Sequence, residues 1–222
     1  MYPVCDDLYL GGSYGYTRSF SKHAHGDNHI NMNTFSFFGN FHKERYYINF
    51  LLNGGPLNNS MSRCIELLDV RRTASGSSSG SQVGVSSAGA YYFLNRNSIQ
   101  FGPCADIEYN RIKIGGYKEC DAGSANLCYN THFWNSVITG IGLQVQWDHA
   151  CSGGDFTANV NLLANKDWKN HNEDIHFHVA SIPGSHGKLP VCIDHSAFAV
   201  VNVHTQFIGN NDVTFTLGYQ GR

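Results

Sequence analysis

The run from Ile99 to Tyr109 alternates at every step between apolar side chains and side chains that are small or polar. The apolar face carries Ile99, Phe101, Pro103, Ala105, Ile107 and Tyr109, and the other face carries Ser98, Gln100, Gly102, Cys104, Asp106 and Glu108. A period of two, held over about eleven residues, is the period of a β-strand and excludes a helix. Strands of soluble proteins usually have about 5–6 residues, whereas a tilted strand that crosses a bilayer needs about 9–11. The length of this run therefore favours a membrane β-barrel.

The same alternation recurs along the chain and predicts about nine antiparallel strands. The predicted strands are 8–20, 30–41, 45–53, 84–93, 99–109, 132–147, 155–163, 196–207 and 213–221. They are joined by long connections at 21–29, 54–80, 110–130 and 165–190, and by short ones at 42–44, 94–97, 150–153 and 208–212. Alternation of short and long connections is typical of up-and-down outer-membrane barrels, whose turns face the periplasm and whose loops lie outside the cell.

The longest connection, 54–80, contains the Gly/Ser-rich stretch 75–81. Such a composition is typical of a flexible segment, so we predict a mobile loop there.

The faces opposite the apolar ones carry Ser, Thr, Asn, Gln and Gly, and few charges. Charged residues make up 14% of the chain, compared with about 25% in typical soluble proteins. If the apolar faces formed the core of a soluble protein, the opposite faces would be rich in Lys, Glu and Arg. Faces made of small uncharged residues suit the enclosed, water-filled lumen of a barrel instead. Aromatic residues near the strand ends are predicted to form interfacial girdles. These are Tyr16, Phe41, Tyr46, Tyr91, Tyr92, Trp134, Trp147, Phe207 and Tyr219.

Several classes of protein are disfavoured. The net charge of −2 argues against a nucleic-acid partner held through phosphates. A stretch of about 18 apolar residues does not occur, so a transmembrane helix is excluded. The N-terminal segment has no basic region followed by an apolar one, so either the protein is not exported or this chain lacks its own beginning.

The sequence contains no evident catalytic or cofactor site, and we expect no enzyme activity. The glycine-rich stretches lack the Lys-Ser/Thr of a P-loop, and no Gly-x-Ser-x-Gly elbow occurs. His176 and His178 share a strand face and could begin a metal site, although loop histidines are more often only solvated. The histidines that could extend this site or form a second one are His171, His186 and His195, and His23, His25 and His29.

Seven cysteines leave at least one unpaired, and no Cys-x-x-Cys occurs. Cys120 and Cys128 could pair and close a loop. The favoured interpretation is that the cysteines are scattered small residues without this pairing.

Motifs spread over most of the chain resemble the C-terminal β-domain, or translocator, of the autotransporters of Gram-negative outer membranes. They are Leu10 to Tyr16, Phe37 to Asn40 followed by Tyr46 to Asn49, Arg63-Cys64-Ile65, Gly102-Pro103 with Tyr109, Gly116 to Glu119, Trp168 to His171, and Leu217 to Gln220. Each motif is weak alone, and their order and spacing carry the resemblance.

The resemblance implies a transmembrane barrel that anchors and exports a passenger polypeptide. It implies outer-membrane lipid, the passenger and the barrel-assembly machinery as partners, and no cofactor. The family's barrel has twelve strands, a helix that threads the pore and a terminal aromatic residue. With about nine strands, residues 1–222 are expected to be one truncated barrel domain without passenger or pore helix, an incomplete fragment that cannot seal a pore alone.

Two alternatives remain open. One is a porin-like or adhesin-like outer-membrane barrel with binding loops, and the other is a soluble β-barrel or sandwich that binds a small apolar ligand.

Overall fold

The computed structural model describes residues 2–23, 25–67, 70–96, 98–169, 174–190, 197–209 and 213–221. Within these residues the fold is all-β apart from one short 3-10 turn, η1 (Gly123–Ala125). No helix in the described part of the chain has both the length and the apolar character needed to cross a bilayer.

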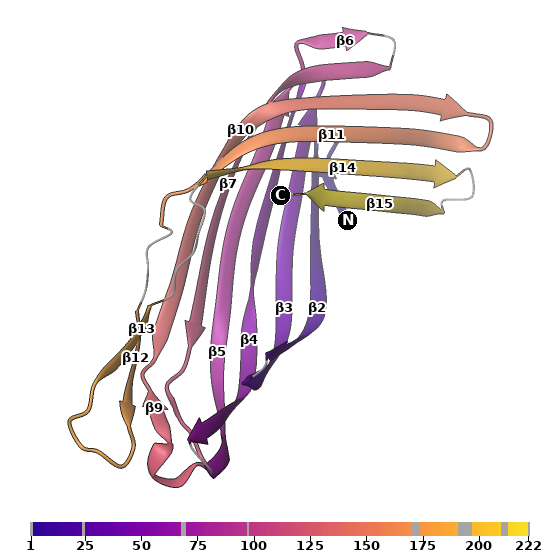
Figure 1. The fold of residues 1–222 in the computed structure, drawn as a ribbon. Helices are drawn as coiled ribbons and strands as arrows, with labels where there is room; N and C mark the ends of the chain where they lie inside the picture. The colour runs from indigo at the N-terminus through magenta and orange to yellow at the C-terminus, as the bar shows by residue number, and fades with distance from the viewer. Residues whose placement is uncertain are drawn as a thin grey trace.

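One antiparallel sheet of 11 strands forms a long, strongly curved strip (Figure 1). Its strands are β1 (Tyr2–Cys5), β2 (Leu8–His23), β3 (Gly26–Lys43), β4 (Tyr46–Leu67), β5 (Val70–Tyr91), β6 (Leu94–Arg96), β7 (Ile99–Ile114), β10 (His132–Cys151), β11 (Gly154–Asp167), β14 (Ala197–Gly209) and β15 (Thr214–Gly221). Each long strand pairs with its neighbours along the chain, from β1 to β15, while β6 pairs only with β7. This is the up-and-down topology predicted from the sequence, and all nine predicted strands are present.

Two predicted loops were wrong, because the strands run much further than the apolar alternation. The segment 21–29 belongs mainly to β2 and β3, which are paired up to His23 and Gly26. The segment 54–80 is not a mobile loop: β4 and β5 have 22 residues each and stay in register from Tyr46 and Tyr91 to their far ends. A backbone ladder does not require apolar side chains, so Gly, Ser and Asn can continue these strands.

The two remaining long connections contain a second, four-stranded sheet. Its strands are β8 (Tyr117–Lys118), β9 (Leu127–Tyr129), β12 (Asp174–Val179) and β13 (Gly187–Pro190), in the order β13-β12-β9-β8. A bridge between Ser75 and Cys120 connects β5 to this region. Figure 1 shows the second sheet at the same end of the molecule as the far ends of β4 and β5.

The main sheet exposes large apolar side chains on one face and buries a polar side chain on the other, which is the reverse of the pattern in a soluble protein. The side that carries Gln144, here called the inner face, buries this side chain completely. The opposite side, here called the outer face, exposes large apolar side chains, among them Ile141 (72%) and Leu217 (74%). A small apolar cluster also lies on the inner face, where Ala90, Cys104, Leu163 and Val200 pack together. The predicted assignment of apolar and polar faces is therefore confirmed.

Candidate functional site

A chain of hydrogen bonds crosses the inner face near the end of the molecule that carries the short turns. The Tyr47 hydroxyl donates to Gln144 Oε1 over 2.5 Å, and Gln144 Nε2 donates to the Tyr92 hydroxyl over 2.6 Å. Tyr92 in turn donates to Gln146 Oε1, and Gln146 Nε2 reaches the carboxylate of Asp148. The network joins β4, β10 and the segment after β5, and it satisfies the polar atoms of Gln144 although this side chain has no contact with solvent.

Beside this network the inner face forms an open hollow of about 430 Å³. It is lined by amide, hydroxyl and imidazole groups, and none of its lining residues is Asp, Glu, Lys or Arg. The lining residues are Asn40, His42, Tyr47, Asn49, Gln144, Gln146, Thr157, Asn159, Asn161, His204 and Gln206. Uncharged groups that both donate and accept hydrogen bonds can solvate a polypeptide backbone without selecting one sequence.

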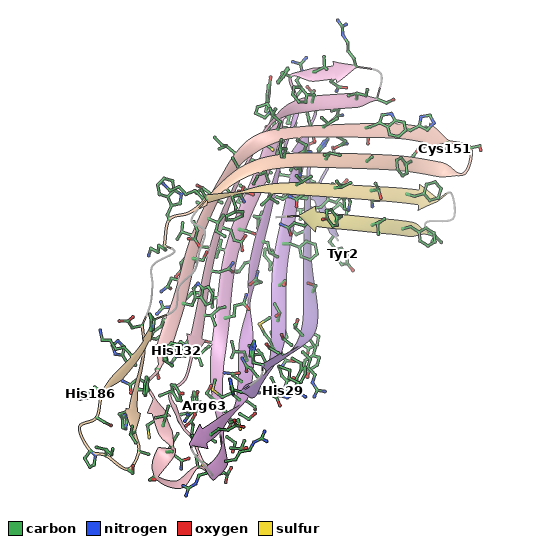
Figure 2. The ribbon with its side chains drawn as sticks, in the orientation of Figure 1. Tyr2, His29, Arg63, His132, Cys151 and His186 are labelled. Atoms are coloured by element: carbon green, nitrogen blue, oxygen red, sulfur yellow. The ribbon has the colours of Figure 1, made fainter. Side chains whose placement is uncertain are left out.

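At the other end, an ion pair whose carboxylate is buried attaches the second sheet to the main one. Arg63 on β4 donates two hydrogen bonds to Glu119, from Nε over 3.1 Å and from Nη2 over 2.7 Å. Glu119 also accepts from the backbone N–H of Leu127 over 2.8 Å, and Arg63 reaches the carbonyl of Ala125. The hydrogen bonds that Arg63 donates to Glu119 raise the pKa of the Arg63 guanidinium further above its ordinary value. Figure 2 places Arg63 at the end of the molecule that carries the second sheet.

Aromatic contacts extend this attachment. The rings of Tyr117 and Tyr129 stack with centroids 4.7 Å apart, and the Tyr117 hydroxyl donates to the sulfur of Met61 over 2.5 Å. Tyr129 also contacts Phe177 on β12. Burial raises the pKa of both tyrosines above the ordinary value of a phenol. The region is therefore held by packing and by charge together.

The girdle prediction was wrong for two residues, Tyr92 and Trp134. Tyr16, Tyr46, Tyr91 and Trp147 are exposed as a girdle requires, but Tyr92 is 1% exposed and belongs to the inner-face network. Alternation along β5 directs Ala90 and Tyr92 inward and Tyr91 outward, and Trp134 shares the inner face of β10 with Gln144 because the register of this strand is unbroken.

The structure does not gather the candidate histidines. His176 and His178 are both exposed on β12, and the ring of His29 contacts Phe20. In the described part of the chain, no three His, Cys, Asp or Glu side chains are close enough together to hold a metal ion. His171 and His195 lie outside the described residues.

Cys120 and Cys128 are both free thiols, so they do not close a loop. Cys192 lies outside the described residues.

No pattern in the sequence indicates the pairing of Arg63 with Glu119. Both residues lie in the motifs named above, but they are separated by 56 positions in the sequence, and no pattern links residues that far apart. Only the folding of the connection 115–131 back onto β4 and β5 brings them together.

Comparisons with known proteins agree with this architecture. A solved structure, the translocator domain of autotransporter NalP from Neisseria meningitidis, matches with a TM-score of 0.71 and 14% sequence identity. The match covers 99% of this chain and 71% of that one. At this identity the match shows a shared fold and nothing further. A search of curated protein sequences found no significant match.

The sequence model of the family described as "Autotransporter beta-domain" matches residues 1–220. Since this match spans nearly the whole chain, and the apolar outer face, polar inner face and up-and-down topology agree with it, the chain belongs to the autotransporter β-domain family, whose members are outer-membrane β-barrel translocators.

Proposed function

We propose that the inner face of the main sheet is the surface along which a passenger polypeptide crosses the outer membrane of a Gram-negative cell, while the outer face contacts lipid. The observation that carries this proposal is the inverted burial. On β10, Gln144 is fully buried on the inner face, whereas its neighbours Leu143 and Val145 are exposed on the outer face. A soluble barrel or sandwich buries its apolar face instead, so this distribution disfavours a soluble ligand binder.

The chemistry of the hollow on the inner face supports the same role. Its amides, such as Asn49, Asn159 and Asn161, offer donors and acceptors but no fixed charge. An extended chain that slides along such a surface exchanges one weak hydrogen bond for another, and a charged surface would instead retain oppositely charged passengers.

Adjacent positions on β11 allow a matched test. A photo-crosslinking residue at Asn159 faces inward, and the same residue at Val160 faces outward. With a reporter polypeptide fused on the N-terminal side of the chain, we expect crosslinks to the reporter from position 159 and crosslinks to lipid from position 160. Reporter crosslinks of equal yield from both positions would contradict the proposal. Membrane insertion without any passage of the reporter would favour the porin-like or adhesin-like alternative.

We also propose that residues 1–222 act as a single barrel-type domain, and that its wall is sealed by further strands on the edges formed by β1 and β15. Over the described residues the main sheet is an open path from β1 to β15. Unpaired backbone groups at such edges cost several kcal/mol each in hydrocarbon. A stable, heat-modifiable monomer formed by this chain alone would contradict the need for added strands.

The barrel-assembly machinery is the proposed partner for insertion, because exposed strand edges require protection until they pair. Depletion of that machinery should reduce the amount of chain that resists extraction from outer membranes. We further propose that the domain acts without catalysis, since binding and passage along the inner face require no bond to be formed or broken. Release of the passenger by the purified chain alone would contradict this.

A further inference from the structure

The outer face of β7, β10 and β11 changes abruptly from apolar to cationic toward the end that carries the second sheet. On β7 the outward residues Ile107 and Tyr109 are followed by Arg111 and Lys113. On β11 the outward residues Leu162 and Ala164 are followed by Lys166, and Trp168 comes next in the same alternation. We call Arg111, Lys113, Phe133, Lys166 and Trp168 the cationic-aromatic patch.

Each cation of the patch lies against an aromatic ring. The Arg111 guanidinium carbon is 4.8 Å from the centroid of the Phe133 ring, and Lys113 Nζ is 6.0 Å from the same centroid. Lys166 Nζ lies 4.1 Å from the centroid of the Trp168 ring. Trp168 is fixed in place, because its Nε1–H donates to Thr139 Oγ1 and its backbone N–H donates to the carbonyl of Val137, each over 2.8 Å. The cations are therefore held near the edge of the apolar band instead of extending freely into solvent.

The three cations have no carboxylate partner among the residues that the structure describes. The neighbouring carboxylates of Glu108 and Asp167 belong to the inner face by strand alternation, and Asp167 accepts a hydrogen bond from Ser136. A hollow of about 480 Å³ opens beside Arg111, and the one carboxylate in its lining, Asp174, pairs with Lys188 over 3.1 Å. The patch thus presents positive charge that these neighbours do not neutralise.

We propose that the cationic-aromatic patch binds the phosphate-bearing headgroup of an anionic membrane lipid, with the lipid's acyl chains on the apolar band below it. This inference rests on the membrane-spanning role proposed above. Guanidinium and ammonium groups bind phosphate through charge-assisted hydrogen bonds. Aromatic rings favour the level between hydrocarbon and water, and long basic side chains reach from the hydrocarbon edge to the headgroups. An ordinary solvated surface would have mixed charges and no alignment with the edge of an apolar band.

The two ends of the sheet contain natural fluorescent reporters. Replacing Trp134 and Trp147 by Phe leaves Trp168 as the only tryptophan, within the patch. Replacing Trp134 and Trp168 by Phe leaves only Trp147, which lies at the short-turn end of β10. The full chain with either reporter is reconstituted in phosphatidylcholine containing a minor fraction of phosphatidylglycerol. Bromine, which quenches nearby tryptophan, is carried in one sample by the anionic lipid and in the other by the neutral lipid.

We expect the Trp168 reporter to show about fivefold enrichment of the anionic lipid over its bulk fraction, falling as salt is added. The Trp147 reporter should show less. The variant R111Q/K113Q/K166Q should lose the enrichment, whereas R111K/K113R/K166R, which keeps every charge, should retain it. Because the result is a ratio between two lipids, a change in the intrinsic emission of Trp168 cancels.

The outcomes separate the two proposals. If neither lipid quenches either reporter, the outer face does not contact lipid and the membrane-spanning role is wrong, and the patch proposal falls with it. If both lipids quench Trp168 in proportion to their bulk fractions, only the headgroup proposal is wrong. Enrichment that persists in the R111Q/K113Q/K166Q variant would remove these three residues from the site.

Discussion

The guanidinium of Arg63 and the carboxylate of Glu119 form a two-point ion pair across 56 positions of sequence, with donor–acceptor distances of 3.1 and 2.7 Å. Glu119 is 2% exposed and Arg63 is 37% exposed, so one member of the pair has left water almost completely. Such a pair is sensitive to the loss of either partner, because the remaining group keeps its desolvation cost without its compensation.

Replacing Glu119 by Gln should loosen the second sheet. The variant keeps the side chain's volume and removes its charge, and we expect a local loss of about 1.5–3 kcal/mol, the usual range for hydrogen bonds to charged groups. Hydrogen exchange at the amides of 117–118 and 127–129 measures this. The control is Asp174→Asn, which breaks the more exposed pair with Lys188 and should cost about 0–1 kcal/mol. Equal protection in both variants would contradict a special role for Glu119.

Alkaline pH should release the same region. Burial raises the pKa of Tyr117 and Tyr129, which means that the folded state holds these two phenol protons more tightly than the unfolded state. Their contribution to stability is therefore complete below the unfolded value of about 10 and is lost as pH rises from there through the folded values. Phenolate absorbance followed against pH should reveal a late-titrating fraction that shrinks in Tyr117→Phe. A titration identical in the two proteins would count against the burial of Tyr117.

Replacing Gln144 by Leu should destabilise the main sheet although it introduces an apolar residue at a buried position. The Tyr47 hydroxyl would lose its partner, at a cost of about 1–3 kcal/mol for an unsatisfied group, while the Tyr92 hydroxyl would keep its bond to Gln146. The measurement is the midpoint of thermal loss of β-sheet circular dichroism in detergent. Leu143→Ala, on the exposed outer face of the same strand, is the control and should shift the midpoint less. A larger shift for Leu143→Ala would indicate a conventional apolar core behind that residue.

An arginine should have opposite consequences at two adjacent positions of β11. Leu162 is 54% exposed on the outer face, where a charge would enter hydrocarbon and cost about 2–4 kcal/mol near the membrane centre. Asn161 lines the hollow on the inner face, where water solvates the charge. We expect Leu162→Arg to lower the yield of insertion into vesicles and Asn161→Arg to leave it nearly unchanged. Equal yields would mean that the two faces do not meet different solvents.

The sequence determined the parts of the fold where one side of a strand is apolar and exposed. In β7 and β10 the apolar alternation is strong, and the predicted faces agree with the observed exposure of Ile107 and Ile141. The apolar alternation stops before the strands end, and for this reason the sequence did not reveal the far halves of β4 and β5. Their Gly, Ser and Asn residues have poor strand propensity, and their pairing in register with neighbouring strands overrides it.

The second sheet could not be predicted from the sequence, for a different reason. Its strands have only two to six residues, too few for periodicity to separate them from a loop, although the alternation at His176 and His178 was visible. The ion pair of Arg63 and Glu119 depends on where a connection folds, and no local pattern encodes it. The inward position of Tyr92, in contrast, follows from the alternation that also places Ala90 on the inner face.

The length of β4 and β5 has a consequence for what the cell presents to its surroundings. A strand of 22 residues is about 70 Å long, whereas a tilted strand uses only about 9–11 residues to cross the hydrocarbon. The remainder is a continuous hydrogen-bonded pair of strands, which in the proposed membrane-spanning role extends beyond the lipid. An antibody against an epitope within 60–65 or 72–77 should therefore bind intact cells, while one against residues at membrane level should require permeabilised envelopes.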